Sequence, residues 1–323
     1  MSELLIESAV HGIAPRSDQL LTLGGDVERG RSTQADFDEQ VAIETADWLA
    51  LQAEAGITYP EDGKLRWQDH LRPIVAATEG FAPGINDAPV TRWYYSNTFY
   101  REPTITGDLE FNPKVFEEQV GPLGPNVSLL APDTFASLCR NRFDGIPADR
   151  NVWRLYSDIL AHFEDSGVKR VLFEDYIPGG TTLQPLDSLE RHSAWYPGLQ
   201  LGLLTHHGVH PNTVALPVDE ATNIGVTIPS SVLSHIAKNT PRGLRPRLNN
   251  VEIIQPIVDG TRTDRPQHTL DRDQVRVIAE CNPARVVLTH SIDLERLPLR
   301  YAQEKVKLLG ELARQAQAEV ASL

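Results

Sequence analysis

The chain has 323 residues with a formal net charge of −14, and 41% of its residues are hydrophobic. This length suits one α/β barrel. No apolar run approaches the ~20 residues that span a bilayer, so we expect no membrane contact. A strongly acidic surface repels phosphate backbones, so we do not expect nucleic acid as a partner. The alternative explanation of the acidic surface is that it keeps the protein soluble.

The first residues and the cysteines indicate a reduced compartment. The opening MSELLIESAV contains two glutamates and neither a basic n-region nor a sustained apolar stretch, so we expect no secretory signal. Cys139 and Cys281 lie far apart without a CxxC partner, which argues against a disulfide framework. We therefore expect a cytoplasmic protein.

The first half of the chain predicts one long helix and three short strands. Apolar residues recur at helical spacing over 34–55, and Gly56 is a helix stop. The strand candidates that follow are ITYP (57–60), RWYY (92–95) and VSLLAP (127–132). Asp133 is expected to cap a helix that runs to Arg142.

The second half alternates regularly between strands and helices. Five apolar segments predict strands, at 168–174, 199–207, 223–229, 251–260 and 284–291. Helices are expected after a cap at Asn151, over 230–239, over 270–280 and from about Pro298 to the end. This alternation is the pattern of βαβ units.

About eight strands, most of them followed by helices, predict an α/β fold of the closed (β/α)₈ TIM barrel type. An open doubly wound sheet is the alternative. No GxGxxG or GxxxxGK motif follows any strand, so a nucleotide-binding loop is not indicated. We expect one domain over 1–323, with about 1–35 as an N-terminal extension packed on the barrel.

Polar residues follow several of the predicted strands, at the barrel end where ligands bind. Carboxylates and imidazoles that converge there can bind a metal or share protons. The residues are Glu174, Asp175, Thr205, His206, His207, His210, Asp259, Thr289, His290 and Asp293.

Two of these groups have competing interpretations. The HHxxH spacing of His206, His207 and His210 suits a transition metal held with Glu174, contact with an anionic substrate, or a structural role. The adjacent acids Glu174 and Asp175 indicate function, with loop capping as the alternative.

A second candidate region concentrates aromatic rings and arginines. It contains Arg66, Trp67 and Asp69, and then the segment RWYYSNTFYREP with Tyr95 and Asn97. Flat rings beside cations suit a planar or carboxylate-bearing ligand. An aromatic packing layer under a loop is the alternative.

Six blocks, in order along nearly the whole chain, resemble segments of the cobalamin-independent methionine synthase family. They are GIAPRSDQL (12–20), GITYPEDGKLRWQDHL (56–71), RWYYSNTFYREP (92–103), LAPDTFASL (130–138), VLFEDYIP (171–178) and LTHSIDLERLPLRYAQEKVKLL (288–309). The resemblance implies methyl transfer from a methyl donor, usually a reduced folate, to the sulfur of homocysteine. It also implies a zinc ion that holds that sulfur as a thiolate.

This sequence departs from the zinc pattern of the active members of the family. Their H-x-C pair falls on 205–207, which contains no cysteine, and Ile292 stands where their late D-C-G segment has its cysteine. Neither Cys139 nor Cys281, both expected in helices, replaces these ligands. The acidic pair is also reversed and lacks the family's proline. Zinc bound through cysteine is therefore not expected.

The metal-poor pattern resembles the amino-terminal barrel of the two-barrel synthases, and the separate chains like it that some organisms encode beside a zinc-bearing chain. The resemblance implies a methyltransferase component with methylfolate or another methyl donor as co-substrate, and with a zinc-bearing homologous barrel as a partner. Arg16, Arg66, Trp67 and Asp69 would hold the donor. The acceptor would face Glu174, Asp175 and His207.

Two other functions stay open. One is a diverged enzyme of the superfamily, such as a carbon–sulfur lyase, that acts on a small organic acid or thiol. There His206, His207, His210 and His290 would serve as acid–base groups or metal ligands. The other is a non-catalytic binding barrel.

Overall fold

The computed structural model describes residues 4–94, 98–177, 189, 191–206, 224–228, 251–264, 270 and 272–322. The chain divides into two compact units. The first unit comprises Met1–Arg66, Val218–Ala221 and Gly225–Leu323, and the second comprises Trp67–Pro217 and Thr222–Ile224. No helix in the described part of the chain is long and apolar enough to cross a bilayer.

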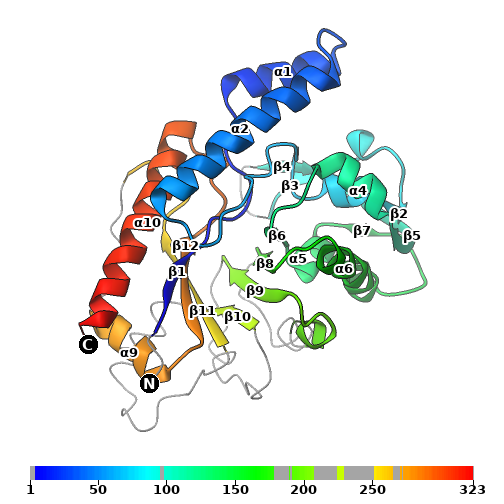
Figure 1. The fold of residues 1–323 in the computed structure, drawn as a ribbon. Coiled ribbons are helices and arrows are strands. Elements are labelled where there is room, and N and C mark those ends of the chain that lie inside the picture. Colours follow the sequence, from blue (N-terminus) through cyan, green and yellow to red (C-terminus); the bar gives the residue numbers. More distant parts are fainter. Residues whose placement is uncertain are drawn as a thin grey trace. The chain divides into compact units, whose positions relative to one another are not determined.

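The first unit is built on parallel strands in the order β1-β12-β11-β10 (Figure 1). These strands are β1 (Ile6–Ser8), β12 (Arg285–His290), β11 (Val251–Val258) and β10 (Ile224–Thr227). In the register, Val286 of β12 lies beside Ile6 on one side and Ile253 on the other. The near-continuous burial of β11 and β12 is typical of a parallel sheet that is covered on both faces.

Helices α1 (Asp18–Glu28), α2 (Gln34–Ala55), α9 (Arg272–Cys281) and α10 (Leu299–Ala321) belong to the same unit. Helix α2 begins with a capping box, in which Thr33 accepts from the backbone of Asp36 while the Asp36 carboxylate accepts from that of Thr33. It ends at Gly56, whose φ of 76° is left-handed. Helix α10 packs against α2 at Gly310, where a Cβ atom would lie 2.0 Å from the carbonyl oxygen of Ala55.

The second unit contains three parallel strands in the order β9-β8-β6. They are β9 (Gln200–Thr205), β8 (Arg170–Asp175) and β6 (Asn126–Leu130), and the short helix α5 (Pro132–Ser137) directly follows β6. The helix α6 (Ala148–Asp165) buries one face, which includes Tyr156, Ile159 and Phe163. This apolar stripe recurs every three or four residues, as a helix packed on a core requires.

Smaller elements complete the second unit. A three-stranded sheet has the order β2-β5-β7, and a two-stranded hairpin pairs β3 with β4. The elements are α3 (Arg72–Ala76), β2 (Thr78–Phe81), η1 (Ile85–Asp87), β3 (Val90–Arg92), β4 (Phe99–Arg101), β5 (Thr104–Phe111), α4 (Pro113–Val120) and β7 (Arg140–Asn141).

Parallel strands joined by helices confirm the predicted α/β class, but not a closed eight-stranded barrel. The described residues contain four such strands in the first unit and three in the second, and no eighth. The candidate ITYP forms only an isolated bridge between Ala9 and Tyr59. The RWYY candidate is wrong as a barrel strand, because Val90–Arg92 pairs antiparallel with Phe99–Arg101.

Two predicted helix boundaries are also wrong. Helix α5 begins at Pro132 with Ala131 as its N-cap and ends at Ser137, so Asp133 lies in its first turn and the helix does not reach Arg142. Asn151 lies inside α6 and does not cap it, because its side chain instead binds the backbone of Leu109. The helix expected over 230–239 lies outside the described residues.

Candidate functional site

In the second unit, two adjacent carboxylates lie at the carboxyl end of β8. Glu174 is fully buried and Asp175 is 4% exposed. The Thr134 hydroxyl and the Ile177 backbone N–H both donate to Oδ1 of Asp175, at 2.8 and 3.0 Å. These donors fix the direction of the Asp175 carboxylate, because Thr134 comes from α5 and Ile177 from the loop after the strand.

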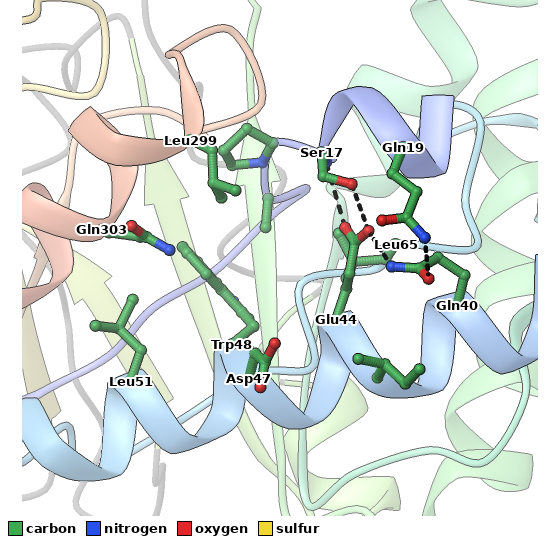
Figure 2. A pocket seen from close by; sticks show the side chains of 13 residues that line it. Ser17, Gln19, Gln40, Glu44, Asp47, Trp48, Leu51, Leu65, Leu299 and Gln303 are labelled. Carbon is green, nitrogen blue, oxygen red and sulfur yellow. Dashed lines mark hydrogen bonds between the residues drawn. The ribbon is translucent and has the colours of Figure 1, made fainter. Parts of the chain in front are cut away.

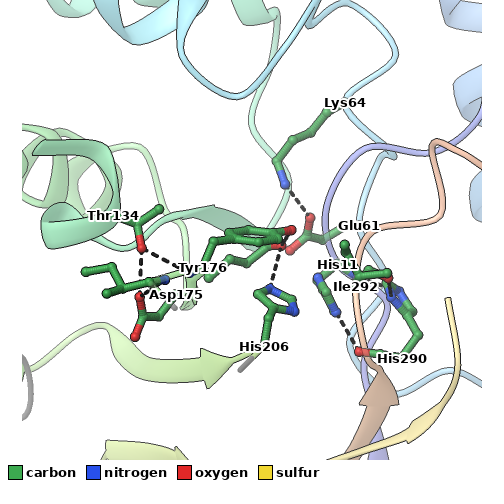
Figure 3. Close-up of polar contacts among 11 residues, drawn as sticks. His11, Glu61, Lys64, Thr134, Asp175, Tyr176, His206, His290 and Ile292 are labelled. Atoms are coloured by element: carbon green, nitrogen blue, oxygen red, sulfur yellow. Dashed lines mark hydrogen bonds and ion pairs between the residues drawn. The ribbon is translucent and has the colours of Figure 1, made fainter. Parts of the chain in front are cut away.

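Tyr176 and His206 cover the Glu174 carboxylate. The Tyr176 hydroxyl donates to Oε2 of Glu174 at 3.0 Å, and Nε2 of His206 lies 3.5 Å from the same oxygen. The rings of Tyr176 and His206 are stacked with their centroids 4.0 Å apart (Figure 3). His206 follows β9, whose end is held beside Asp175 by the bond from the His206 N–H to the Asp175 carbonyl oxygen. This site therefore combines two buried carboxylates, a phenol and an imidazole.

Part of the predicted aromatic block packs against this cluster. The indole of Trp93 meets the ring of Tyr176 edge to face at 5.5 Å. Tyr94 has an unusual left-handed φ of 45°, and its hydroxyl lies 2.6 Å from the Ser137 hydroxyl. Burial raises the pKa of Tyr94, and the nearby Asp175 charge adds to that rise. This segment thus contributes a packed aromatic layer, as the alternative interpretation expected, and that layer lies beside the carboxylates.

In the first unit, two buried histidines form a fixed pair at the ends of β1 and β12. The rings of His11 and His290 stack at 3.9 Å, and both residues are 1% exposed. The His11 backbone N–H donates to Nε2 of His290 at 3.2 Å. Nδ1 of His290 must then carry the proton that it shares with the Ile292 carbonyl oxygen at 2.6 Å. The predicted site residue His290 is therefore held as the Nδ1–H tautomer.

A buried ion pair lies in the loop after α2. Nζ of Lys64 is 3.0 Å from Oε2 of Glu61, and the two side chains are 2% and 4% exposed. The backbone of Lys64 is left-handed with φ of 49°. The carboxamide of Gln52 holds the Glu61 backbone through two hydrogen bonds. Non-glycine residues with such a backbone are uncommon, so this loop is held by its surroundings rather than by local preference.

The residues predicted to hold a methyl donor make internal contacts. Arg16 donates to the Leu65 carbonyl oxygen at 2.9 Å, and Arg66 pairs with Asp38. In the second unit, the buried Trp67 packs edge to face on Phe116.

Asp69 and Asp259 both accept hydrogen bonds from their own loops. Asp69 receives the backbone N–H groups of Leu71 and Arg72. Asp259 accepts from both the backbone and the hydroxyl of Thr261. Burial alone would raise the pKa of Asp259, but the Thr261 hydrogen bonds and nearby cations hold it below its ordinary value.

Several predicted site residues lie outside the described part of the chain, namely Tyr95, Asn97, His207 and His210.

The sequence analysis did not single out His11, Thr134 or Tyr176. The positions of Thr134 and Tyr176 carried a usable signal, because each neighbours a residue that was selected. His11 comes three residues after β1, a strand that lies in the segment taken as an N-terminal extension.

The cysteines offer no thiolate site. Cys139 lies in the turn between α5 and β7, not in a helix as expected, while Cys281 is the last residue of α9. Burial, together with the Glu102 charge, raises the pKa of the Cys139 thiol, and Cys281 is 1% exposed. Among the described residues, no group of three His, Cys, Asp or Glu side chains is arranged to hold a metal ion.

In this α/β fold, carboxylates and imidazoles follow the parallel strands, at the ends where proteins of this fold class generally bind small ligands. No family model and no curated protein matches the sequence.

Solved structures do match the fold. One is a candidate vitamin B12-independent methionine synthase from Listeria monocytogenes, with a TM-score of 0.66 and 12% identity over 97% of this chain and 99% of that one. Another is a B12-independent methionine synthase from Shewanella sp. W3-18-1 in complex with selenomethionine, with a TM-score of 0.65 and 13% identity over 99% of this chain and 100% of that one. At such identities the likeness shows a shared fold.

Proposed function

We propose that this chain is a methyltransferase component of the methionine synthase type, which acts on the sulfur of a small amino-acid thiol. The single observation that carries the proposal is the pair of buried carboxylates at the end of β8, Glu174 and Asp175. A cationic partner stabilises the ionised form of carboxyl groups that are withdrawn from water, and the α-ammonium group of an amino acid is such a partner. The Shewanella structure of the same fold contains selenomethionine, an amino acid of this kind.

The neighbours of the carboxylates suit this role. Thr134 and Tyr176 each donate to one carboxylate and so orient both, while the His206 imidazole stacks on the phenol. An ammonium group held there would place the rest of the amino acid at the carboxyl ends of β8 and β9. His206 would then be the imidazole nearest to the bound thiol, and His207, outside the described residues, would follow it.

A cysteine-bound zinc does not fit this chain. Ile292 stands at the position of the family's late cysteine, and its carbonyl oxygen is used to orient His290. Cys281 is buried and the pKa of the Cys139 thiol is raised, so neither thiol is suited to metal binding. We therefore propose that the thiol is activated with the help of a separate zinc-bearing barrel, and that methylfolate or another methyl donor is the co-substrate.

Binding of L-methionine tests the amino-acid site directly. We expect Glu174→Gln to weaken binding about tenfold or more, because a hydrogen bond to a charged group contributes about 1.5–3 kcal/mol. The amide preserves the shape of the side chain and an oxygen for the Tyr176 hydroxyl. Titration calorimetry would measure the affinity, with Glu118→Gln, an exposed change on α4, as the control. Equal affinities for both variants would refute the proposed site.

Turnover tests the second part of the proposal. The chain alone should give no methionine from homocysteine and a methyl donor, and the addition of a zinc-bearing homologous barrel should give turnover. A stoichiometric transition metal in the purified chain that is lost in His207→Ala would instead favour an independent metalloenzyme with a histidine site.

A further inference from the structure

A cavity of about 250 Å³ lies in the first unit, between α2 and the first turns of α10 (Figure 2). Helix α2 contributes one face of side chains at helical spacing, including Glu44, Asp47 and Trp48. The opposite wall comes from the segment after β1, from Leu65, and from Leu299 and Gln303 of α10. None of the residues that line the cavity has a role in the proposed function.

The polar side of the cavity is acidic and already ordered. Glu44 accepts hydrogen bonds from the Ser17 hydroxyl, the Ser17 backbone N–H and the Gln40 carboxamide, at 2.5, 3.2 and 2.9 Å. Gln40 in turn accepts from Gln19, which extends the chain of hydrogen bonds along the wall. Asp47 follows Glu44 on the same helix face and makes no hydrogen bond or ion pair with another described residue. No lysine or arginine belongs to the described lining, so these carboxylates have no cationic neighbour there.

The remaining wall is apolar but carries one further polar side chain that a ligand can reach. Leu65 and Trp48 are 3% and 5% exposed and form a buried floor. The indole Nε1–H of Trp48 is buried against Gly63, where a Cβ atom would lie 2.9 Å from it, so a ligand in the cavity does not reach it. The carboxamide of Gln303 makes no hydrogen bond with another described residue, and it supplies both a donor and an acceptor.

We infer that this cavity binds a small organic ammonium ion that also carries a hydroxyl group. The ammonium satisfies the Asp47 and Glu44 carboxylates, which lack a counter-charge, and the hydroxyl oxygen accepts from the carboxamide of Gln303. The body of the ligand contacts the leucine and tryptophan side chains. A carboxylate on the ligand is rejected, because the lining offers it no cation and two like charges. The exclusion of a ligand carboxylate distinguishes this cavity from a site that binds amino acids.

Three probes of one shape test the inference. L-Phenylalaninol carries the amine and a hydroxymethyl group, 2-phenylethylamine lacks the hydroxymethyl group, and L-phenylalanine has a carboxylate in its place. Titrations followed by protein NMR shifts should give affinities in that order, with no saturable binding of phenylalanine at this cavity. Equal or tighter binding of phenylalanine would overturn the inference, as would shifts that do not involve α2.

Variants of the wall give the second readout. Asp47→Asn and Glu44→Gln should each weaken phenylalaninol about fivefold, because a charge pair near the surface is worth about 1 kcal/mol. Glu39→Gln, on the same helix but outside the cavity, is the matched control. Asp47 is exposed and makes no hydrogen bond or ion pair with another described residue, so Asp47→Asn should leave the melting temperature unchanged. A loss of affinity in this variant would therefore reflect binding and not folding. A loss of phenylalaninol affinity no larger than that of the control would contradict the inference. Neither variant should change the affinity for methionine, so this test is independent of the proposed function.

Discussion

Lys64 lies in an unfavourable environment in the first unit. Its ammonium group is almost fully buried, its backbone is left-handed, and the compensating charge comes from Glu61 at 3.0 Å. A buried ion pair of this kind adds little net stability over an apolar pair, but the loss of one partner leaves the other charge uncompensated.

We therefore expect Lys64→Met to lower the free energy of unfolding by about 3–5 kcal/mol. The double variant Glu61→Gln with Lys64→Met should recover much of that loss. Urea denaturation would measure both. Lys307→Met is the matched control, since its partner Glu54 lies 3.9 Å away and both side chains are exposed. A double variant as unstable as the single one would show that packing, not charge, dominates at this position.

At the residue scale, sequence reasoning identified positions better than roles. Glu174, Asp175, His206 and His290 were predicted from their places after strands, and the structure puts them at strand ends. The partners that orient them were not predictable. Thr134 is 41 residues from Asp175 along the chain, and His11 is 279 from His290. Such contacts depend on which strands become neighbours, and no local pattern encodes that.

At the scale of elements, the contact between α2 and α10 depends on one missing side chain. A Cβ atom at Gly310 would lie 2.0 Å from the Ala55 carbonyl oxygen and 3.4 Å from its Cβ atom. The neighbouring atoms are backbone atoms of a helix end and cannot move aside easily. The close approach of the two helices is therefore possible only with glycine at this position.

We expect Gly310→Ala to lower the melting temperature even though alanine favours a helix by about 1 kcal/mol. The control is Gly25→Ala in α1, where a Cβ atom would meet only the flexible guanidinium group of Arg29 at 3.0 Å. That change should be neutral or slightly stabilising. Differential scanning calorimetry of both variants would decide, and a stabilised Gly310→Ala protein would show that the helices separate without cost.

The long elements were the most predictable ones. The predicted helix over 34–55 has the observed bounds of α2, because apolar spacing, a cap and a terminal glycine all agree. Strand β1 has only three residues and gives no periodic signal. RWYY was taken for a barrel strand because aromatic residues favour any strand, and composition does not distinguish a hairpin from a parallel sheet.

At the scale of the whole molecule, the net charge of −14 is the dominant electrostatic feature. Like charges in a compact chain repel one another, and dissolved salt screens that repulsion. The many surface carboxylates thus act against folding at low ionic strength.

We expect the melting temperature to rise as KCl is added at neutral pH. A variant with Glu39→Gln, Glu118→Gln and Glu311→Gln, all at exposed positions, should melt higher at low salt and respond less to KCl. Thermal scans over a salt series would measure both slopes. Identical slopes for the two proteins would assign the effect to the ion itself rather than to charge repulsion.

The α/β class followed from the alternation of strands and helices over the second half of the chain, where the signal is strong. The division into two compact units was not predictable, because both units contain strands of the same type and no change of composition marks a boundary. The single domain that the sequence predicts over 1–323 stays a prediction.

The pairing of β1 with β12 has a consequence for how the protein is made. Ile6 lies beside Val286 in the register, and the backbone N–H of Ile6 also binds the side chain of Gln317. A ribosome therefore releases β1 long before β12 exists, and the backbone groups of β1 that pair with β12 stay without that partner through most of translation. A nascent chain stalled before residue 285 would expose that edge, which makes this early segment a natural place for a chaperone to bind.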